Sequence, residues 1–180
     1  MAYIQLPDNA VGMRGLMAFR PHLAPHLGAF TEGILCIEEG LTKAEREIIG
    51  TLVSKLNDCQ LCEGVHGAVA ACYLNDNEAL IEQIKEDYEN APISDKLKAL
   101  LSIASSVQKG GKHVTQSQIN KARELGATDI EIHDTVIIAA TFCFFNRYLD
   151  GMGITAIDDP EVFRQRGKMI AEGLGYAPKK

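Results

Sequence analysis

The chain has 180 residues, of which 46% are hydrophobic and 23% are charged, a composition typical of a folded globular protein. Its 18 basic and 24 acidic residues give a net charge of -6, and there is no basic run, which argues against binding to nucleic acid or to an anionic membrane surface. The longest apolar stretch, residues 136–145, is about half as long as a membrane-spanning helix, and residues 1–17 lack a signal-peptide pattern. We therefore expect a cytoplasmic protein.

Helix signals follow one another along the chain, and no segment shows the alternation of polar and apolar residues that is typical of a β-strand. A short turn near residues 11–19 comes first. The predicted helices then span residues 22–36, 43–56, 59–74, 77–89, 94–108, 116–125, 129–149 and 160–172. The sequence therefore predicts an all-α fold, a single-domain bundle of about seven to nine helices that comprises residues 1–180.

Several of the helix starts carry capping motifs, in which a side chain binds the free backbone amides of the first turn. Three starts have the capping-box pattern of Thr followed three residues later by Glu or Gln: Thr42, Thr115 and Thr128. Asn75 with Glu78 is a weaker version of this box, and Asp159 before Pro160 predicts the start of the last helix. Residues 135–145 are apolar nearly all round, which predicts a helix buried on most of its surface.

The five cysteines are Cys36, Cys59, Cys62, Cys72 and Cys143. Their odd number and the lack of a secretion signal argue against a disulfide-stabilised secreted fold. Cys59 and Cys62 form a Cys-x-x-Cys motif. With Asn57 or Asp58 as the N-cap, we expect this motif in the first turn of a helix. The other three cysteines have no such neighbours, and we interpret them as small buried hydrophobic residues.

His66 lies one helical turn after Cys62, so the two cysteines and the histidine share one stripe of that helix. Val69, Ala70 and Tyr73 continue the stripe, which indicates that it faces the interior. The helix N-terminus favours a thiolate, whereas apolar surroundings raise the pKa of a thiol, so a base is needed. His66 can be that base.

Glu47 is a candidate fourth member of this site. It lies on the preceding helix, on the face opposite the apolar stripe, together with the small residues Gly50, Thr51 and Ser54. Small side chains there indicate that another helix or another subunit packs closely against this face. A carboxylate in such a place can orient a thiol or an imidazole; the alternative is a solvated glutamate.

Two other kinds of chemistry compete with a redox dithiol. Zinc can take the two thiols, the imidazole and an acid as ligands, but structural zinc sites normally join two separate ligand pairs, and the sequence shows no second pair. A nucleophilic cysteine hydrolase is the other alternative. The second thiol, three residues from the first, favours disulfide chemistry because it can resolve a sulfenic acid formed on its neighbour.

The combination Glu47-x11-Cys59-x2-Cys62-x3-His66 resembles the signature of the alkylhydroperoxidase D (AhpD-like) branch of the carboxymuconolactone decarboxylase superfamily. Residues 131–153 resemble a second block found in the subgroup called peroxidase-related proteins. The resemblance covers a core of about residues 30–155 and leaves helical extensions at both ends. Leu61 stands between the cysteines, where the best-known members have a histidine.

The resemblance implies an AhpD-like bundle that forms homo-oligomers (a dimer, trimer or hexamer), with the dithiol in a pocket near a subunit interface. It implies that Cys62 attacks a small-molecule peroxide, that Cys59 resolves the product, and that Glu47 and His66 relay protons. No metal, flavin or haem cofactor is implied, and the dithiol needs an external reductant such as a thioredoxin-like electron donor. The lactone chemistry of the decarboxylase branch fits less well, because that branch lacks the dithiol.

The sequence therefore predicts a thiol-dependent peroxidase that reduces alkyl hydroperoxides or hydrogen peroxide in antioxidant defence. Two alternatives stay open: a non-catalytic protein whose dithiol regulates its assembly or a partner, and a protein disulfide reductase. Turnover of peroxide with a supplied dithiol separates a catalytic dithiol from a regulatory one.

Overall fold

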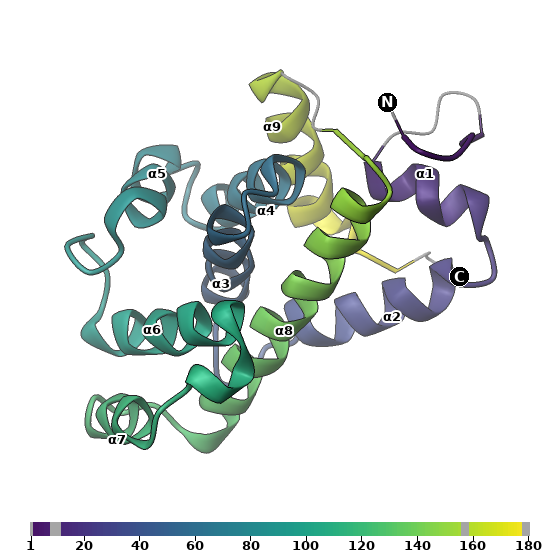
Figure 1. The fold of residues 1–180 in the computed structure, drawn as a ribbon. Helices are drawn as coiled ribbons and strands as arrows, with labels where there is room; N and C mark the ends of the chain where they lie inside the picture. Colours follow the sequence, from purple (N-terminus) through teal and green to yellow (C-terminus); the bar gives the residue numbers. More distant parts are fainter. Residues whose placement is uncertain (1, 8–11, 156–158, 178–180) are drawn as a thin grey trace.

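The computed structural model describes residues 2–7, 12–155 and 159–177. Within these residues the fold contains nine α-helices and no β-strand, which confirms the predicted all-α class (Figure 1). The helices are α1 (Gly12–Phe19), α2 (Ala24–Leu35), α3 (Lys43–Leu56), α4 (Gln60–Tyr73), α5 (Glu78–Asp87), α6 (Asp95–Lys109), α7 (Gln116–Glu124), α8 (Asp129–Gly151) and α9 (Pro160–Met169). A 3₁₀ turn, Gly111–His113, follows α6, and a π-helical turn, Ile170–Leu174, follows α9.

The predicted helix starts are largely confirmed. Complete capping boxes begin three helices, at Thr42, Thr115 and Thr128. The cap predicted for α5 is wrong, because Asn77 rather than Asn75 is the cap and accepts a hydrogen bond from the Leu80 backbone N–H at 3.1 Å. Asn75 has a φ of 58° and belongs to the turn that follows α4.

The chain departs from prediction most at its two ends. α2 begins at Ala24 rather than at residue 22, and Val11 of the predicted N-terminal turn lies outside the described residues. α9 ends at Met169, and the π-helical turn after it contains Gly173 with a φ of 117°. This left-handed residue redirects the chain, so that the following residues reach the α2 side chain of Glu32.

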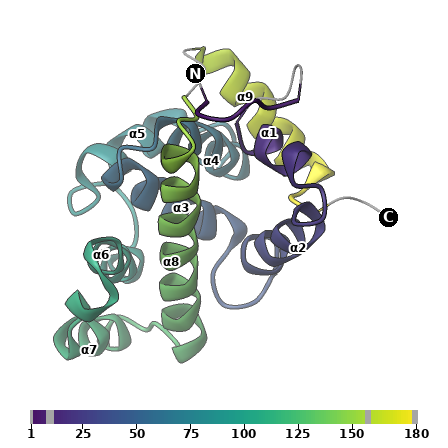
Figure 2. The same cartoon turned by 45° about the vertical axis from the view of Figure 1, so that its right-hand side comes forward.

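α8, the longest helix, crosses the centre of the molecule, and the other helices pack around it (Figures 1 and 2). α3 and α4 are antiparallel neighbours with the most extensive contact in the fold, and α3 also packs against α6 and α8. α7 packs on α6, and α9 lies across α4. The candidate site residues therefore lie where α3, α4 and α8 meet.

The face of α3 that carries Glu47, Gly50, Thr51 and Ser54 is buried within this one chain. A Cβ atom at Gly50 would lie only 2.3 Å from the Phe142 ring of α8, so glycine lets the two helices approach closely. Thr51 likewise packs closely against Gly67 of α4: a Cβ atom at Gly67 would lie 3.4 Å from the methyl group of Thr51. The predicted close packing is confirmed, but helices of the same chain supply it, so this face gives no support for a subunit interface.

A buried arginine, which the sequence analysis did not identify, ties the start of α3 to α8. The Arg46 guanidinium donates to the backbone carbonyls of Leu41, Ile34 and Glu39. It also forms an ion pair with Asp134 at 2.8 Å. A buried charge that loses its partners typically lowers the stability of the folded protein by roughly 3–5 kcal/mol. The contacts of Arg46 therefore hold the loop before α3 in place.

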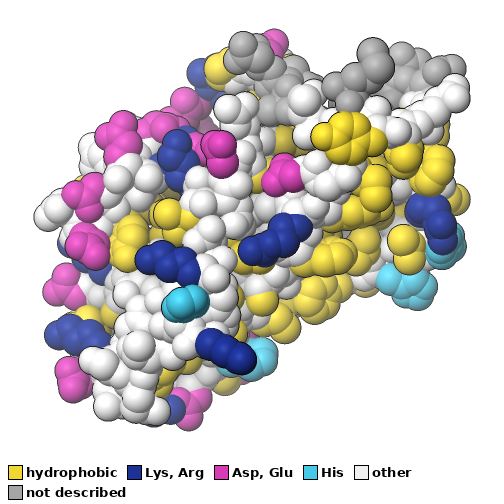
Figure 3. All heavy atoms as spheres, in the orientation of Figure 1, with side chains coloured by type: hydrophobic (Ala, Val, Ile, Leu, Met, Phe, Trp, Pro, Cys, Tyr) yellow, Lys and Arg dark blue, Asp and Glu magenta, His cyan; other side chains and the backbone are white. Residues whose placement is uncertain are grey.

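The face of the molecule in Figure 3 has two different regions. Acidic side chains gather over α5, whereas apolar side chains gather over α1, α2 and α8. On these three helices, large exposed apolar residues include Phe19, Phe30 and Phe144. Residues 135–145 are buried on most of their surface, as predicted, although Phe144 among them is exposed. None of the described helices is long and apolar enough to cross a membrane.

Candidate functional site

The Cys-x-x-Cys motif lies at the tight turn between α3 and α4. Cys59 is itself the N-cap of α4, whereas the sequence predicted Asn57 or Asp58 in that position. Asp58 has a φ of 58° and forms the turn, and the Cys59 backbone N–H donates to the Ser54 carbonyl at 2.9 Å. The turn thus places Cys59 at the open end of the helix and Cys62 within its first turn.

The two thiols are close together and almost completely buried. Cys59 is 3% exposed and Cys62 is 7% exposed, and both are free thiols. A hydrogen bond from the Cys62 thiol to the Cys59 sulfur lowers the pKa of Cys59. The same bond, together with burial, raises the pKa of Cys62. In the reduced pair, therefore, the first negative charge is favoured on Cys59, and the Cys62 proton stabilises it.

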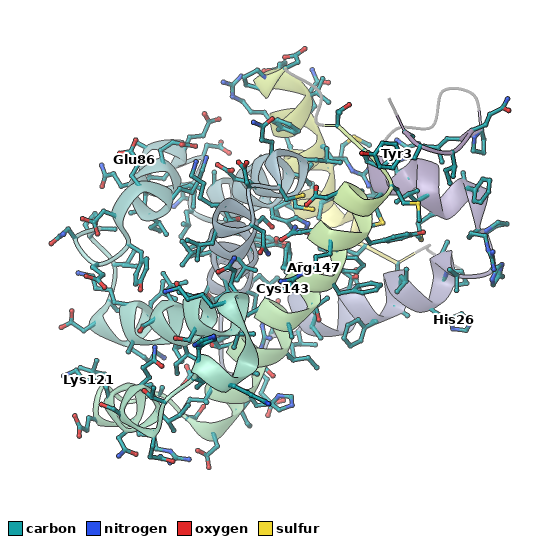
Figure 4. The ribbon with its side chains drawn as sticks, in the orientation of Figure 1. Tyr3, His26, Glu86, Lys121, Cys143 and Arg147 are labelled. Carbon is teal, nitrogen blue, oxygen red and sulfur yellow. The ribbon has the colours of Figure 1, made fainter. Side chains whose placement is uncertain are left out.

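The dithiol has apolar surroundings that come largely from the N-terminal part of the chain. The neighbouring side chains are Ile4, Leu6, Met13, Leu16, Met17, Leu61, Tyr148, Leu149, Met152 and Ile154. Tyr3 anchors this N-terminal part between α1 and the end of α8, where its backbone N–H donates to the Met152 carbonyl at 2.9 Å (Figure 4). Such surroundings disfavour a thiolate, so the polar contacts of the sulfurs decide its stability.

One polar side chain of α8 reaches the dithiol. Asn146 is fully buried, and hydrogen bonds from its side chain lower the pKa of both Cys59 and Cys62. Its amide nitrogen also donates to the Ser54 hydroxyl at 3.1 Å, and its amide oxygen accepts from Asn57 at 2.8 Å. The sequence placed Asn146 in the second family-like block, but nothing in its spacing showed that it would face the thiols.

Glu47 and His66 form the second part of the site. The Glu47 carboxylate is 1% exposed, which is incompatible with the solvated glutamate that the sequence left open. Its Oε2 lies 2.7 Å from Nδ1 of His66, so the structure brings together a carboxylate of α3 and an imidazole of α4. With the Nδ1 proton directed at the carboxylate, Nε2 is the nitrogen left free to accept or to donate a proton.

Tyr176, a residue that the sequence analysis missed, completes this second part. Its hydroxyl donates to Oε1 of Glu47 at 2.6 Å and lies 3.2 Å from Nδ1 of His66. Its ring stacks on the imidazole with 5.6 Å between the ring centres, and the Phe142 ring contacts the imidazole edge-on at 4.6 Å. Burial and the nearby Glu47 raise the pKa of Tyr176 well above its ordinary value, so its hydroxyl keeps its proton.

The structure does not bring the two parts into direct contact. His66 hydrogen bonds to Glu47, with the Tyr176 hydroxyl 3.2 Å from the same nitrogen, and in the described part of the chain it forms no hydrogen bond to either thiol. Cys62 and His66 are nevertheless one turn apart on α4, a spacing that places their Cβ atoms about 5–6 Å apart. The buried Val69 and Ala70 continue the same stripe, as predicted.

Two more titratable side chains lie near the thiols: Tyr148 packs around the dithiol, and the charge of Asp150 raises the pKa of both thiols. Cys143 is buried as predicted, but Cys36 and Cys72 are partly exposed, which corrects the prediction for these two. Burial and the neighbouring Glu32 and Glu47 raise the pKa of Cys36 to about 12. Arg147 donates back to the carbonyl of Cys143, one turn earlier on α8 (Figure 4). Among the described residues, no three side chains of the metal-binding types gather closely enough to hold a metal ion.

A surface groove between α4, α5 and α9 lies on the opposite face of α4. Its lining includes Glu63, Gly64, Gly67, Lys85 and Phe163, and neither thiol contributes to it. The chemistry-bearing residues are therefore enclosed by α3, α8 and the two ends of the chain.

Several solved structures have a similar fold. A peroxidase-related protein from Ralstonia eutropha JMP134, described as an alkylhydroperoxidase AhpD core, has a TM-score of 0.77 and 29% sequence identity over 87% of this chain and 80% of that chain. A peroxidase-related protein from Silicibacter sp. TM1040 has a TM-score of 0.75 and 22% identity, over 85% and 78%. The debrominase Bmp8 has a TM-score of 0.68 and 16% identity, over 84% and 80%. The last two show likeness of fold alone.

The sequence comparisons add a family. No curated protein matches the chain significantly. Residues 77–156 match the carboxymuconolactone decarboxylase family, a segment that contains α5 to α8 and Asn146 but follows the dithiol. This match covers less than half of the chain; with the shared fold, it supports the predicted resemblance to the AhpD-like branch of the carboxymuconolactone decarboxylase superfamily.

Proposed function

We propose that the protein is a thiol-dependent peroxidase that uses the Cys59–Cys62 dithiol. The observation that carries the proposal is the arrangement along α4. Two buried thiols, each of which shifts the pKa of the other, lie one helical turn from an imidazole, and the imidazole is held by a buried carboxylate. A nucleophile and a proton carrier on one rigid helix are the two components that cleavage of an O–O bond requires.

In the first step, the Cys62 sulfur attacks one oxygen of a hydroperoxide. The reacting pair carries one negative charge, held at first on Cys59, and the proton that Cys59 has lost lies on His66; the Cys62 proton then moves to Cys59, which leaves a thiolate on Cys62. A sulfur–oxygen bond forms while the O–O bond breaks, and the products are a sulfenic acid on Cys62 and an alkoxide or hydroxide. His66, protonated at Nε2, gives that leaving oxygen its proton, so an alcohol or water departs.

In the second step, the Cys59 sulfur attacks the Cys62 sulfenic acid. The disulfide forms, hydroxide leaves, and the Cys59 proton converts it to water. The net change is one dithiol and one hydroperoxide converted to one disulfide, one alcohol and one water. An external dithiol, such as a thioredoxin-like protein, then reopens the disulfide by thiol–disulfide exchange. This chemistry needs no metal, flavin or haem.

The roles of the two thiols follow from their positions. Cys62 is the residue one turn from His66, so an oxygen leaving from a reactant on Cys62 is within reach of Nε2. The lowered pKa of Cys59 favours the opposite assignment, with Cys59 as the attacking thiol. The position of a trapped sulfenic acid decides between the two.

We also propose that the protein functions as a cytoplasmic homo-oligomer. The support is the apolar side chains that gather over α1, α2 and α8 (Figure 3), and the exposure of large residues such as Phe30 and Phe144 on these helices. Light scattering should return a multiple of the 19.6 kDa chain mass. A monomer at micromolar concentration would contradict this proposal.

A regulatory dithiol is the second candidate function, and the deep burial of both thiols favours it. A thiol that is only 3% or 7% exposed meets an external reductant only after the chain around it moves. In this case oxidation would change assembly or a partner contact without turnover. Members of the same superfamily without a dithiol perform lactone chemistry, which the Cys-x-x-Cys motif does not serve.

The test is peroxide consumption by the purified protein, with and without a dithiol such as dithiothreitol. The peroxidase proposal predicts consumption of many equivalents per chain with the dithiol and one equivalent without it. Hydrogen peroxide and an organic hydroperoxide are assayed in parallel. Consumption that stops at one equivalent, even with excess dithiol, would support the regulatory dithiol instead.

A further inference from the structure

The C-terminal segment returns to the interior and places one side chain against the Glu47–His66 pair. Tyr176 is 110 residues from His66 in sequence, yet its hydroxyl reaches Oε1 of Glu47 at 2.6 Å and its ring lies against the imidazole. The other oxygen of the same carboxylate, Oε2, bonds to Nδ1 of His66. One buried carboxylate thus receives a tyrosine hydroxyl on one oxygen and a histidine N–H on the other.

The backbone before Tyr176 has the features of a built anchor. Gly175 has a φ of 63°, and a Cβ atom there would lie 2.7 Å from Oε2 of Glu32. The backbone N–H of Tyr176 donates to that Glu32 oxygen at 2.6 Å, and the N–H of Ala177 donates to it at 3.4 Å. Gly173, with a φ of 117°, turns the chain two residues earlier. Two left-handed glycines and a side-chain anchor therefore deliver the tyrosine to this position.

The tyrosine hydroxyl has one acceptor that it can use. Nδ1 of His66 supplies its own proton to Glu47, so it has no free lone pair for the hydroxyl, whereas Oε1 of Glu47 has. In the described part of the chain, Oε1 has no other donor. Without the hydroxyl, this buried oxygen would lose its partner, and both carboxylate oxygens would compete for the imidazole N–H.

We propose that Tyr176 is a positioning residue of the relay. It holds Glu47 by one oxygen so that the other fixes the orientation and tautomer of His66, and its ring restricts the tilt of the imidazole. The effect of Tyr176 on catalysis rests on the proposed peroxidase function. Its role in positioning Glu47 and His66 is inferred from the geometry alone. Tyr176 acts through Glu47 and His66 and touches neither thiol.

The proposal has a consequence for pH dependence. The groups that face Tyr176 from the surrounding elements are Glu32 and Cys36 from the α2 region, Glu47 from α3, His66 and Tyr73 from α4, and Arg166 from α9. A carboxylate that loses a donor is less stable in its ionised form, so it holds a proton to higher pH. Loss of the Tyr176 hydroxyl should therefore move the acidic limb of the activity profile to higher pH.

The test compares Tyr176→Phe with Tyr88→Phe, a matched loss of a hydroxyl from a partly buried tyrosine at the end of α5. Peroxide turnover is measured between pH 5 and 9, and the imidazole nitrogen resonances of His66 are followed by NMR in the reduced protein. For Tyr176→Phe we expect a kcat roughly tenfold lower, as one hydrogen bond to a charged group would give, an unchanged KM, and an acidic limb at higher pH. Tyr88→Phe should match the unmodified protein.

The NMR measurement keeps the positioning role separate from the peroxidase proposal. If the unmodified protein reduces no peroxide, the proposed function fails, and the His66 resonances alone decide the role of Tyr176. A change of these resonances in Tyr176→Phe but not in Tyr88→Phe supports the positioning role. Unchanged resonances with an unchanged pH profile overturn it, even if Tyr176→Phe unfolds at a lower temperature.

A second variant tests the delivery of the tyrosine. Gly175→Ala keeps the hydroxyl but places a Cβ atom against Glu32 in a backbone conformation that alanine disfavours. It should reproduce the pH shift and the His66 resonance change of Tyr176→Phe. Normal His66 resonances in Gly175→Ala would show that the glycine turn is not what positions Tyr176.

Discussion

One stripe of α4 passes through two different environments. At its N-terminal end, Cys59 and Cys62 lie among aliphatic and methionine side chains, with Asn146 as a polar contact. One turn later, His66 lies between a buried carboxylate, a tyrosine hydroxyl and two aromatic rings. The same helix thus carries its nucleophile in an apolar region and its proton carrier in a hydrogen-bonded one.

The two regions stabilise charge in different ways, one for the Glu47 carboxylate and the other for the thiols. A carboxylate such as Glu47 stays charged in the interior only if donors satisfy its oxygens, and His66 and Tyr176 do so. The thiols have a smaller set of donors, and each thiol depends on the other: the bond that lowers the pKa of Cys59 raises that of Cys62. Reactivity at the sulfurs is therefore set by few contacts, and substitutions on the two sides should have distinguishable effects.

The largest effect is expected when the apolar side loses its nucleophile. Cys62→Ser should abolish peroxide turnover, because no sulfur is left to attack. Cys59→Ser should reduce one equivalent of peroxide and leave a sulfenic acid on Cys62 that a dimedone-type probe labels, with mass spectrometry as the measurement. Cys72→Ser, a partly exposed thiol further along α4, is the control and should leave turnover unchanged.

The label also tests the assignment of roles. Labelling of Cys59 in Cys62→Ser, with none of Cys62 in Cys59→Ser, would reverse the attacking and resolving thiols. That outcome would agree with the lowered pKa of Cys59 and would move the reacting sulfur to the helix cap.

Substitutions on the hydrogen-bonded side should have the next largest effects. His66→Gln and Glu47→Gln should each slow turnover roughly 10²–10⁴-fold, the usual range for a positioned acid–base group. The double variant should lose less than the sum of the two free energies, because both residues act in one pair joined at 2.7 Å. Full additivity in steady-state assays would mean that the two residues act independently.

A smaller effect is expected from Asn146→Leu, which removes a polar contact of the thiols. Because hydrogen bonds from Asn146 lower the pKa of both thiols, the variant should need a higher pH for alkylation. At neutral pH we expect iodoacetamide to react roughly tenfold more slowly, the effect of one hydrogen bond to a charged group.

Ser54→Ala is the matched control for this variant. It removes the hydroxyl that accepts from Asn146 but leaves the amide in place beside the sulfurs. Alkylation slowed equally in both variants would show that Asn146 acts through packing around the turn and not through the thiols.

Local features of the sequence predicted the fold well. Hydrophobic periodicity and the three threonine capping boxes depend on residues within four positions of each other, and these placed most helices within two residues. The errors arose at Asn and Asp residues, because these residue types are common both as helix caps and as left-handed residues of turns. Asn75 and Asp58 are both good caps, but both adopt the left-handed conformation of a turn, and the next suitable residue takes the cap.

The candidate site could be predicted only in part. The spacing on α4 placed the two thiols and His66 on one stripe, and the family-like pattern added Glu47, which the structure places in contact with His66. Asn146 and Tyr176 are distant in sequence, and their contacts depend on how α8 and the C-terminal turn pack. A single sequence carries no signal for such packing, so only the three-dimensional arrangement shows them.

The contact between Gly50 and Phe142 has a consequence for how relatives of this chain can diverge. The Phe142 ring occupies the space that a side chain at position 50 would need, and the ring also contacts the His66 imidazole edge-on. An alanine at position 50 would push the ring toward the imidazole unless position 142 became smaller at the same time. We therefore expect these two positions to covary among homologues with this dithiol, with bulk gained at one balanced by bulk lost at the other.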